Sequence, residues 1–256
     1  MITNVQNTKQ DILLSNLYFY KSILFVKKKL IVFTGAGISA ESGLKTFRDN
    51  EGLWEEYKIE DVATPEAWKK NPALVLDFYN KRREAIINAK PNEAHYALVE
   101  LEKKFDVTII TQNIDDLHER AGSTNVIHLH GEITKSRSSI DASLVYPLGN
   151  SYLKQGQLCP LGSQLRPHIV WFGELVPLIN TANDVAKTAD IFIIICTSLN
   201  VYTAAGLVNF VPDKIKKFLI DPNAPSKYYI QNLTIITKTA VNGVPPLVEK
   251  LLKECY

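Results

Sequence analysis

The chain has 256 residues, 46% of them apolar and 22% charged, which is enough to bury one large core with a smaller appended module. Its 29 basic residues are dispersed and nearly balanced by 27 acidic ones, which argues against a nucleic-acid-binding surface, and we expect no nucleic-acid partner. The cysteines form no close pair, which disfavours a disulfide framework and predicts a cytoplasmic protein: Cys159, Cys196 and Cys255.

Residues 1–27 precede the first strong strand pattern, and we expect them to form an N-terminal helical extension. Their opening, MITNVQNTKQD, is polar and lacks the basic start and apolar stretch of a secretory signal peptide. The apolar run from Leu13 to Val26 is interrupted by polar residues and falls short of the ~20 apolar residues that span a bilayer. This run predicts an amphipathic helix, and we expect no association with a membrane.

Beyond this extension, apolar runs rich in β-branched residues alternate with stretches of helical periodicity. The apolar runs predict strands at Leu30–Phe33, Val107–Ile110, Ile191–Ile195, Lys217–Ile220 and Leu233–Ile236. The periodic stretches predict helices near Glu93–Lys104, Thr181–Thr188, Ala204–Phe210 and Pro245–Glu254. This alternation is typical of an α/β protein with a doubly wound, Rossmann-like parallel sheet, in which ligands bind at the carboxyl ends of the strands.

Two segments leave the alternating pattern. Residues 52–91 are helical in character, and residues 133–165 are rich in Ser, Gly and Pro. We expect these two insertions to form a smaller module within one main domain, residues 28–256.

The first predicted strand runs into a glycine-rich turn, LIVFTGAGISAESG. Its G-x-G-x-x-A spacing places Gly35 where a tight turn is needed, Gly37 where backbone N–H groups can approach a pyrophosphate, and Ala40 where a helix packs on its strand. A phosphate would then lie at a helix N-terminus, where the helix dipole favours an anion. The alternative is a glycine-rich turn that binds no ligand.

Polar residues follow the second predicted strand in the block TQNIDDLHERAG. Asn113 and Asp115 form a short polar pair just past the strand end, although either side chain could also cap a helix. His130, in the block HLHGE, is the candidate general base because an imidazole can accept a proton at neutral pH. The other histidines are assigned to packing or hydrogen bonding: His95, His118, His128 and His168.

Taken together, these blocks resemble the sirtuins, a family of NAD-dependent protein lysine deacylases. The blocks GAGISAESG, TFRDNEGLW, TQNIDDLHERAG, HLHGE, LRPHIVWFGE and TSLNVYTAAGL occur in the order of that family, and the resemblance covers roughly Lys28 to Cys255. It implies that residues 28–256 form a sirtuin catalytic domain. It also implies that NAD is the cofactor and that acylated lysine side chains of proteins are the partners.

The resemblance implies a reaction in which the acyl oxygen attacks the ribose and nicotinamide leaves. His130 then helps a ribose hydroxyl to attack, and the products are free lysine, nicotinamide and O-acyl-ADP-ribose. The sequence leaves the oligomeric state open, with a monomer as the expectation.

The resemblance also implies the site residues. His130 and Asn113 are the catalytic pair, and Asn113 and Asp115 are assigned to the nicotinamide and ribose region. Phe47 would shield the reacting sugar, and Arg48 would contact the phosphates or the nicotinamide side. The cofactor-binding set is Gly35, Ala36, Gly37, Ala40, Thr46, Phe47, Arg48, Trp54, Gln112, Asn113, Ile114, Asp115, Cys196, Thr197, Ser198, Asp221, Pro222, Asn223 and Ala240. The segment that lines the acyl-lysine tunnel is Trp171, Phe172 and Gly173.

The acyl preference has its own motif. Ala63, Tyr79 and Arg82 look like the pocket of the class III, desuccinylase and demalonylase sirtuins, where a small residue makes room and Tyr and Arg bind a carboxylate. At positions i and i+3 of a helix, a phenol and a guanidinium can converge on an acidic acyl tail. The alternative is a solvated basic helix end, since Lys81 and Arg83 flank the motif.

The chain departs from the family at its metal site. Most sirtuins carry two C-x-x-C pairs, whereas this chain has KSRSSID and CPLG in the corresponding module, so at most one ligand survives. Four ligands are needed for a tetrahedral structural zinc, and we therefore expect no zinc. We expect a small apolar core to replace it, built from Tyr146, Leu148, Leu153 and Leu158.

Two substitutions fall near the cofactor. Cys196 stands where a glycine is usual, and Asp221 stands where an asparagine is common. The carboxylate of Asp221 could still accept hydrogen bonds from ribose hydroxyls.

The sequence thus predicts an NAD-dependent protein lysine deacylase that removes succinyl or malonyl groups as well as acetyl. One alternative is a protein ADP-ribosyltransferase on the same fold, against which His130 and the Tyr79 and Arg82 motif argue. Another is a catalytically inactive NAD-binding regulatory module. A hydride-transfer dehydrogenase fits less well, because no second strand ends in an acid about 20 residues after the glycine turn.

Overall fold

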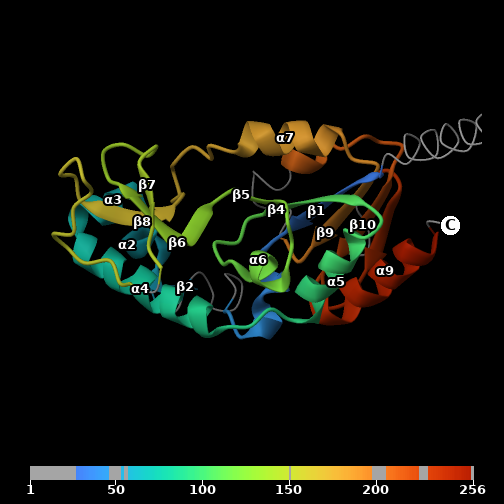
Figure 1. The fold of residues 1–256 in the computed structure, drawn as a ribbon, viewed down its shortest axis with the longest axis horizontal. Coiled ribbons are helices and arrows are strands. Elements are labelled where there is room, and N and C mark those ends of the chain that lie inside the picture. The colour runs from blue at the N-terminus through green and yellow to red at the C-terminus, as the bar shows by residue number, and fades with distance from the viewer. Residues whose placement is uncertain are drawn as a thin grey trace, which may run out of the picture.

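The computed structural model describes residues 27–45, 53–54, 57–149, 151–197, 206–224 and 230–254. Figure 1 shows two lobes side by side along the long axis, a larger one around a twisted sheet and a smaller one of helices and short strands. In these described ranges, no helix is long and apolar enough to cross a membrane. Most of the expected N-terminal extension lies outside the described residues.

The larger lobe is organised by a parallel sheet with the strand order β11-β10-β9-β1-β4-β5. Its strands are β1 (Lys29–Thr34), β4 (Asp106–Thr111), β5 (Val126–His128), β9 (Ile191–Ile195), β10 (Lys216–Ile220) and β11 (Leu233–Ile236). The predicted doubly wound α/β fold and its strands are confirmed. Strand β5 was not predicted from the sequence, because a strand of three residues is too short to stand out by periodicity.

Helices cover both faces of this sheet, as Figure 1 shows. On one face, α5 (Glu93–Leu101) and α9 (Ala240–Glu254) pack against each other and close an apolar core that includes Leu98 and Val32. On the other face, α7 (Ile179–Lys187) buries Ala182 and Ala186 against the sheet. The predicted helices are confirmed with shifted ends; of the stretch Ala204–Phe210, residues 206–208 are helical and 204–205 lie outside the described residues.

Helix α9 begins five residues earlier than the prediction, at Ala240, and continues through two prolines. Burial explains this, because Ala240 and Val244 are almost fully buried and Gly243 lies directly on the sheet. A Cβ on Gly243 would lie 2.6 Å from a methyl carbon of Ile220. Tertiary packing therefore outweighs the unfavourable helix propensity of proline and glycine.

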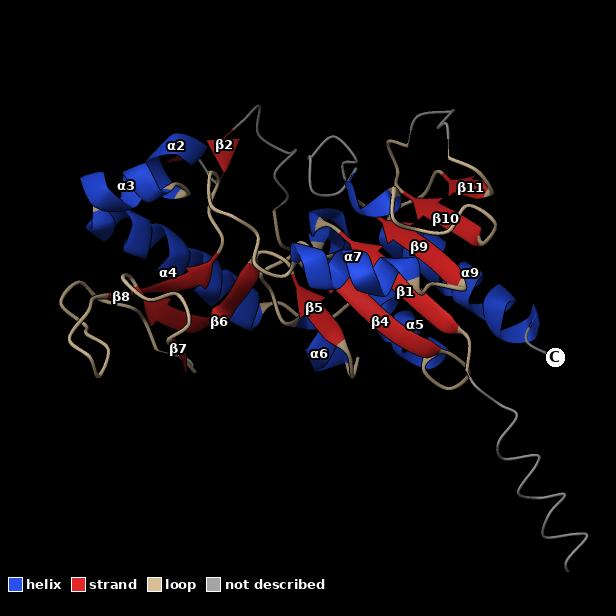
Figure 2. Cartoon of the chain, turned by 90° about the horizontal axis from the view of Figure 1, so that it is seen from above, coloured by secondary structure: helices blue, strands red, loops and turns tan. Residues whose placement is uncertain are grey.

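The smaller lobe joins the two insertions, as seen from above in Figure 2. Its elements are a short hairpin, three helices and an antiparallel sheet of order β7-β6-β8: β2 (Leu53–Trp54), β3 (Tyr57–Lys58), α2 (Ile59–Val62), α3 (Pro65–Lys70), α4 (Pro72–Asn88), β6 (Gly131–Ser138), β7 (Val145–Pro147) and β8 (Leu165–Ile169). Capping fixes where two of the helices begin. The side chains of Thr64 and Asn71 accept backbone hydrogen bonds from Ala67 and Leu74, and each cap is followed by a proline.

An apolar cluster closes the end of this lobe. Leu148 and Leu153 are buried there with Leu76, Cys159 and Leu165, and Tyr146 packs against them. The assignment of Leu158 to this cluster is wrong, because that side chain is 55% exposed and its neighbour Cys159 turns inward. Within the described ranges, no group of three or more His, Cys, Asp or Glu side chains is placed to hold a metal ion.

Candidate functional site

The glycine-rich turn lies at the carboxyl end of β1 and folds into two short 3₁₀ helices, η1 (Ala36–Ile38) and η2 (Ala40–Ser42). Gly35 has a φ of −116°, so the turn does not need a left-handed glycine there. Close approach is the reason instead, because a Cβ on Gly35 would lie 2.7 Å from the carbonyl oxygen of Cys196, and one on Gly37 would lie 2.6 Å from the Cys196 Cβ. The glycines let this turn lie against the end of β9.

Two expectations about the turn are wrong. Ala40 does not pack on the strand, since it is exposed; Ile38 is the buried residue that anchors the turn. The expected regular helix is replaced by three-residue 3₁₀ helices. Because a helix dipole is a sum over aligned peptide units, such short helices offer little of the dipole on which the phosphate prediction relied.

Cys196 follows β9 in the left-handed region, with a φ of 47°. This explains why a glycine is usual there, because a side chain at positive φ is strained. The Cys196 side chain is 7% exposed and lies beside Gly37.

Three polar side chains meet between the turn and the segment after β4. The hydroxyl of Ser39 donates to Asp115 Oδ2 at 3.1 Å, and the amide nitrogen of Asn113 lies 3.2 Å from the same hydroxyl. Asn113 and Asp115 are 6% and 5% exposed. The second carboxylate oxygen of Asp115 accepts the backbone N–H of Leu117, the first residue of α6 (Leu117–Ala121), although the N-cap position of that helix is Asp116.

Burial raises the pKa of Asp115, while the hydrogen bonds from Leu117 and Ser39 act in the opposite direction. Desolvation opposes the charged form of a carboxyl group, and donated hydrogen bonds favour it. The cluster therefore holds a buried acid that is tied to the glycine-rich turn.

Gln112 joins the ends of two strands across β1. Its side-chain oxygen accepts the Thr197 hydroxyl at 2.7 Å, and its backbone N–H donates to the carbonyl of Thr34 at 3.0 Å. The carboxyl ends of β9, β1 and β4 are thereby fixed together, which is the edge where the fold predicts a ligand.

His130 stands two residues after β5 and is half-buried. Its Nδ1 lies 3.0 Å from the carbonyl oxygen of Gln112. A carbonyl can only accept, so Nδ1 carries the proton and Nε2 retains its lone pair. Burial lowers the pKa of His130 despite the opposing bond to Gln112, so the ring is neutral at pH 7 and can act as a base.

The residues predicted for the acyl pocket lie together in the smaller lobe. Ala63, Tyr79 and Trp171 belong to one buried cluster, with the rings of Tyr79 and Trp171 6.5 Å apart. The backbone N–H of Phe172 donates to the Ala63 carbonyl at 3.0 Å, while its ring is 51% exposed. Gly173 follows at a φ of 87°, a conformation that glycine adopts without strain.

Arg82 lies one turn after Tyr79 on α4, and both side chains are buried. Burial raises the pKa of Tyr79 well above its usual range, although the nearby charge of Arg82 lowers it in part. The phenol is therefore a hydrogen-bond donor at any physiological pH. The alternative of a solvated basic helix end is wrong for Arg83, which is 2% exposed and donates to the carbonyls of Ile133 and Gly149.

The remaining predicted residues are more scattered. Asp221 follows β10, is buried, and accepts the backbone N–H of Asn223 at 2.8 Å, while Pro222 and Asn223 are exposed. Ala240 is fully buried at the start of α9, and the backbone carbonyl of Ile114 accepts the N–H of Ile133. Some residues lie outside the described part of the chain, or have side chains that do: Thr46, Phe47, Arg48, Trp54 and Ser198.

A charged network that contacts Trp171 was not predicted from the sequence. The guanidinium carbon of Arg166 lies 3.3 Å from the ring centre of Trp171. Glu174 accepts from Arg166 at 2.7 Å, from Arg137 at 3.0 Å and from the backbone N–H of Trp171 at 2.8 Å. The block LRPHIVWFGE contains three of these residues, but nothing in it signals the contact with Arg137.

Sequence comparison places this arrangement among known proteins. The family model described as "Sir2 family" matches residues 35–203. An NAD-dependent protein deacylase of Bacteroides thetaiotaomicron is 50% identical over 235 residues, covering 88% of this chain and 98% of that protein. One from Helicobacter pylori is 51% identical over 226 residues, covering 88% and 98%.

Solved structures agree with the sequence relatives. A crystal structure of a Sir2 homologue in complex with NAD has a TM-score of 0.79 and 38% identity, covering 90% of this chain and 92% of that one. A mutant Sir2 homologue in complex with 2′-O-acetyl ADP ribose has a TM-score of 0.79 and 37% identity, covering 90% and 94%. The similarity thus extends over nearly the full length of each chain.

Proposed function

The chain belongs to the Sir2 family, and from this premise we propose that it is an NAD-dependent protein lysine deacylase whose pocket favours acyl groups that end in a carboxylate. One observation carries the activity: the neutral imidazole of His130 is bonded to the same segment that presents the buried Asn113 and Asp115. Residues 28–256 would form the catalytic unit, with residues 52–91 and 133–165 supplying the smaller lobe.

The residues at the carboxyl edge of the sheet fit NAD. When bound, NAD supplies an activated ribose carbon that accepts the acyl oxygen as nicotinamide leaves. Asn113 and Asp115 would hold the nicotinamide and ribose end, because an amide and an acid can pair with a carboxamide and with hydroxyls. The glycine-rich turn, which packs closely against Cys196, would lie beside the phosphates. Asp221 would accept from the adenosine ribose.

His130 would then act as the general base. Its Nδ1 proton is committed to Gln112, so Nε2 is available to accept a proton from a ribose hydroxyl. The bond to the Gln112 carbonyl also fixes the orientation of the ring.

The acidic acyl preference is supported by the walls of the pocket. Ala63 leaves space, Trp171 offers an apolar wall for the lysine stem, and Tyr79 and Arg82 place a donor and a cation on one buried helix face. A carboxylate bound beside a buried guanidinium would accept charge-assisted hydrogen bonds, which are about twice as strong as neutral ones.

A direct assay tests the activity and the preference together. Peptides that differ only in an acetyl, succinyl or malonyl group on one lysine are incubated with the protein and NAD, and peptide mass and nicotinamide release are followed. We expect acyl loss with one nicotinamide per turnover, O-acyl-ADP-ribose as product, and a higher kcat/KM for the acidic groups.

The same assay separates the alternatives. ADP-ribosylated protein without acyl loss would instead identify a transferase, and NAD binding without turnover would identify a regulatory module. Equal kcat/KM for acetyl and succinyl peptides would contradict the acidic pocket.

The pH dependence of turnover should report the protonation of His130. The base must be neutral, and burial lowers its pKa from the ordinary value of 6.5. We therefore expect kcat/KM to stay high at pH 6.5 and to fall only as the pH drops below it, through the lowered pKa. A pH–rate profile from about pH 5 to about pH 8 measures this, with intrinsic fluorescence as a control for unfolding. An acid limb centred above pH 6.5 would contradict the assignment.

A further inference from the structure

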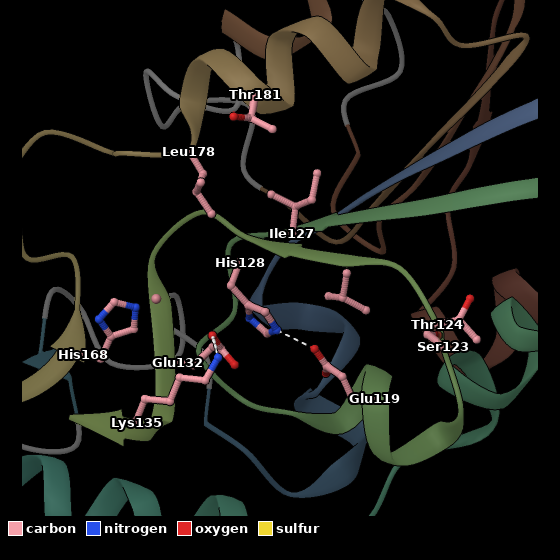
Figure 3. A pocket seen from close by; sticks show the side chains of 12 residues that line it. Glu119, Ser123, Thr124, Ile127, His128, Glu132, Lys135, His168, Leu178 and Thr181 are labelled. Atoms are coloured by element: carbon pink, nitrogen blue, oxygen red, sulfur yellow. Dashed lines mark hydrogen bonds and ion pairs between the residues drawn. The ribbon is translucent and has the colours of Figure 1, made fainter. Parts of the chain in front are cut away.

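A polar cavity of about 430 Å³ opens where β5, β6, α6 and the start of α7 meet, and we call it the second cavity because it lies apart from the residues assigned to the cofactor and acyl groups. Figure 3 shows the rings of His128 and His168 and the carboxylates of Glu119 and Glu132 around it. None of the residues that line this cavity belongs to the predicted cofactor or acyl site. The cavity is therefore distinct from both of those sites.

His128 is the most buried ionisable side chain that lines the cavity, at 8% exposure. Its Nδ1 lies 3.0 Å from the carbonyl oxygen of Asn113, and its Nε2 lies 2.7 Å from a carboxylate oxygen of Glu119, as Figure 3 shows for the latter. A carbonyl and a carboxylate are both acceptors, so both ring nitrogens act as donors and the ring is an imidazolium.

The charge balance agrees with this geometry. Burial by itself would lower the pKa of His128, but the hydrogen bond and the negative charge of Glu119 outweigh it, and the net shift is upward. The same contact lowers the pKa of Glu119. The other charged or titratable groups that act on His128 or line the cavity are Asp115, His118, Glu132, Lys135 and His168.

His128 and His130 thus form hydrogen bonds to two consecutive backbone carbonyls of one segment. His130 is bonded to the carbonyl of Gln112 and His128 to that of Asn113. The side chain of Asn113 is held separately, by Ser39. The peptide unit that follows Asn113 is therefore fixed from the cavity side by a charged donor, while the amide side chain is fixed from the cofactor side.

We propose that His128 and Glu119 are positioning residues for nicotinamide, acting from this second cavity through the backbone of Asn113. The proposal rests on the proposed function, in which Asn113 holds the leaving group. Because the Asn113 carbonyl sets the plane of its peptide, loss of the charged donor lets the segment rotate and misdirects the amide. A small misplacement of a binding group can cost about 10²-fold in rate.

Four variants test this proposal. His128→Leu removes both hydrogen bonds of the ring, whereas His128→Asn keeps an N–H donor near the Nδ1 position. Glu119→Ala removes the carboxylate that favours the charged ring, and Thr181→Ala is a matched control. Glu119 has 39% of its side chain exposed, so its replacement should leave folding intact. Thr181 is an exposed residue of α7 that lines the same cavity. For each protein, KM for NAD, KM for the acyl peptide, the dissociation constant of free nicotinamide and Tm are measured.

In His128→Leu, we expect KM for NAD and the nicotinamide dissociation constant to rise by about tenfold or more, while KM for the acyl peptide stays within about twofold. Glu119→Ala should show the same pattern at about threefold, and His128→Asn should recover most of the loss. Thr181→Ala should match the unmodified protein.

Two results would overturn the proposal. One is unchanged nicotinamide binding in Glu119→Ala and in folded His128→Leu. The other is a uniform loss of every parameter together with Tm, without recovery in His128→Asn. Nicotinamide binding is measured without turnover. A protein that binds nicotinamide normally but removes no acyl group would therefore refute the proposed function, while the binding data would still test the role of His128 and Glu119.

Discussion

Replacing His130 with alanine is expected to lower kcat for deacylation by about 10³-fold, within the range that general-base catalysis supplies. The imidazole Nε2 is the group assigned to accept a proton, and its availability depends on the Nδ1 bond to Gln112. Affinity for NAD should stay within about twofold, because the side chains assigned to hold the cofactor are other residues. Turnover of acyl peptides and equilibrium binding of NAD, measured on the same preparation, check both parts.

His168→Asn is the matched control for that variant. It removes another half-buried imidazole, one that lines the second cavity and has no assigned part in the reaction. Its turnover should equal that of the unmodified protein. If His130→Ala retains full turnover, or if both variants lose it equally, the assignment of the base is wrong.

Replacing Arg82 with methionine is expected to lower kcat/KM for succinyl peptides by about thirtyfold or more and for acetyl peptides by no more than about threefold. Losing one partner of a buried, hydrogen-bonded charge pair costs about 2 to 5 kcal/mol, and each 1.4 kcal/mol is about tenfold. Methionine keeps much of the volume of the arginine stem, so the neighbouring Phe78 and Tyr79 should retain their packing. Parallel kinetics on the two peptides measure the ratio.

Two neighbouring residues on α4 provide controls that separate the loss of carboxylate binding in Arg82→Met from a general loss of charge or of stability. Lys81 is exposed, pairs with Asp77 and lies 3.5 Å from the hydroxyl of Tyr57, so Lys81→Met removes a charge from the exposed side of the same helix, and both substrates should be unaffected. Arg83 donates to the carbonyls of Ile133 and Gly149, so Arg83→Met should lower Tm and affect both substrates alike. An equal loss for acetyl and succinyl in Arg82→Met would show that Arg82 has the structural role instead.

Several features could be predicted from the sequence because their signals are local. The strands β1, β4, β9 and β10 are short, largely buried runs, and burial on both faces leaves an almost unbroken apolar pattern. The edge strand β11 is only partly buried, but its run LTII is still rich in β-branched residues. The residues of the glycine motif lie within a few positions of one another along the chain, as do those of the block HLHGE, so each motif is visible before folding. The same is true of the helical character of residues 52–91.

Other predictions were wrong where the outcome depends on a distant contact. Ala40 was assigned to a packed position by the spacing of its motif and Leu158 to the apolar core by its residue type, but Ile38 and Cys159 are the side chains that turn inward. Arg83 reads as a surface charge, yet two backbone carbonyls from the smaller lobe accept its hydrogen bonds. Nothing near these residues in the sequence specifies those partners.

The two histidines of HLHGE show most clearly which properties depend on the local sequence and which depend on the tertiary structure. The sequence by itself determined a parallel α/β sheet, a ligand at its carboxyl edge and an imidazole that follows a strand. Only the tertiary structure decided that His130, bonded to a single carbonyl, stays neutral, whereas His128, bonded to a carbonyl and to Glu119, is charged. The physical reason is that hydrophobic periodicity depends on residues that are close together in the sequence. The protonation state of a histidine depends instead on the acceptors that the fold brings within hydrogen-bonding distance of its ring.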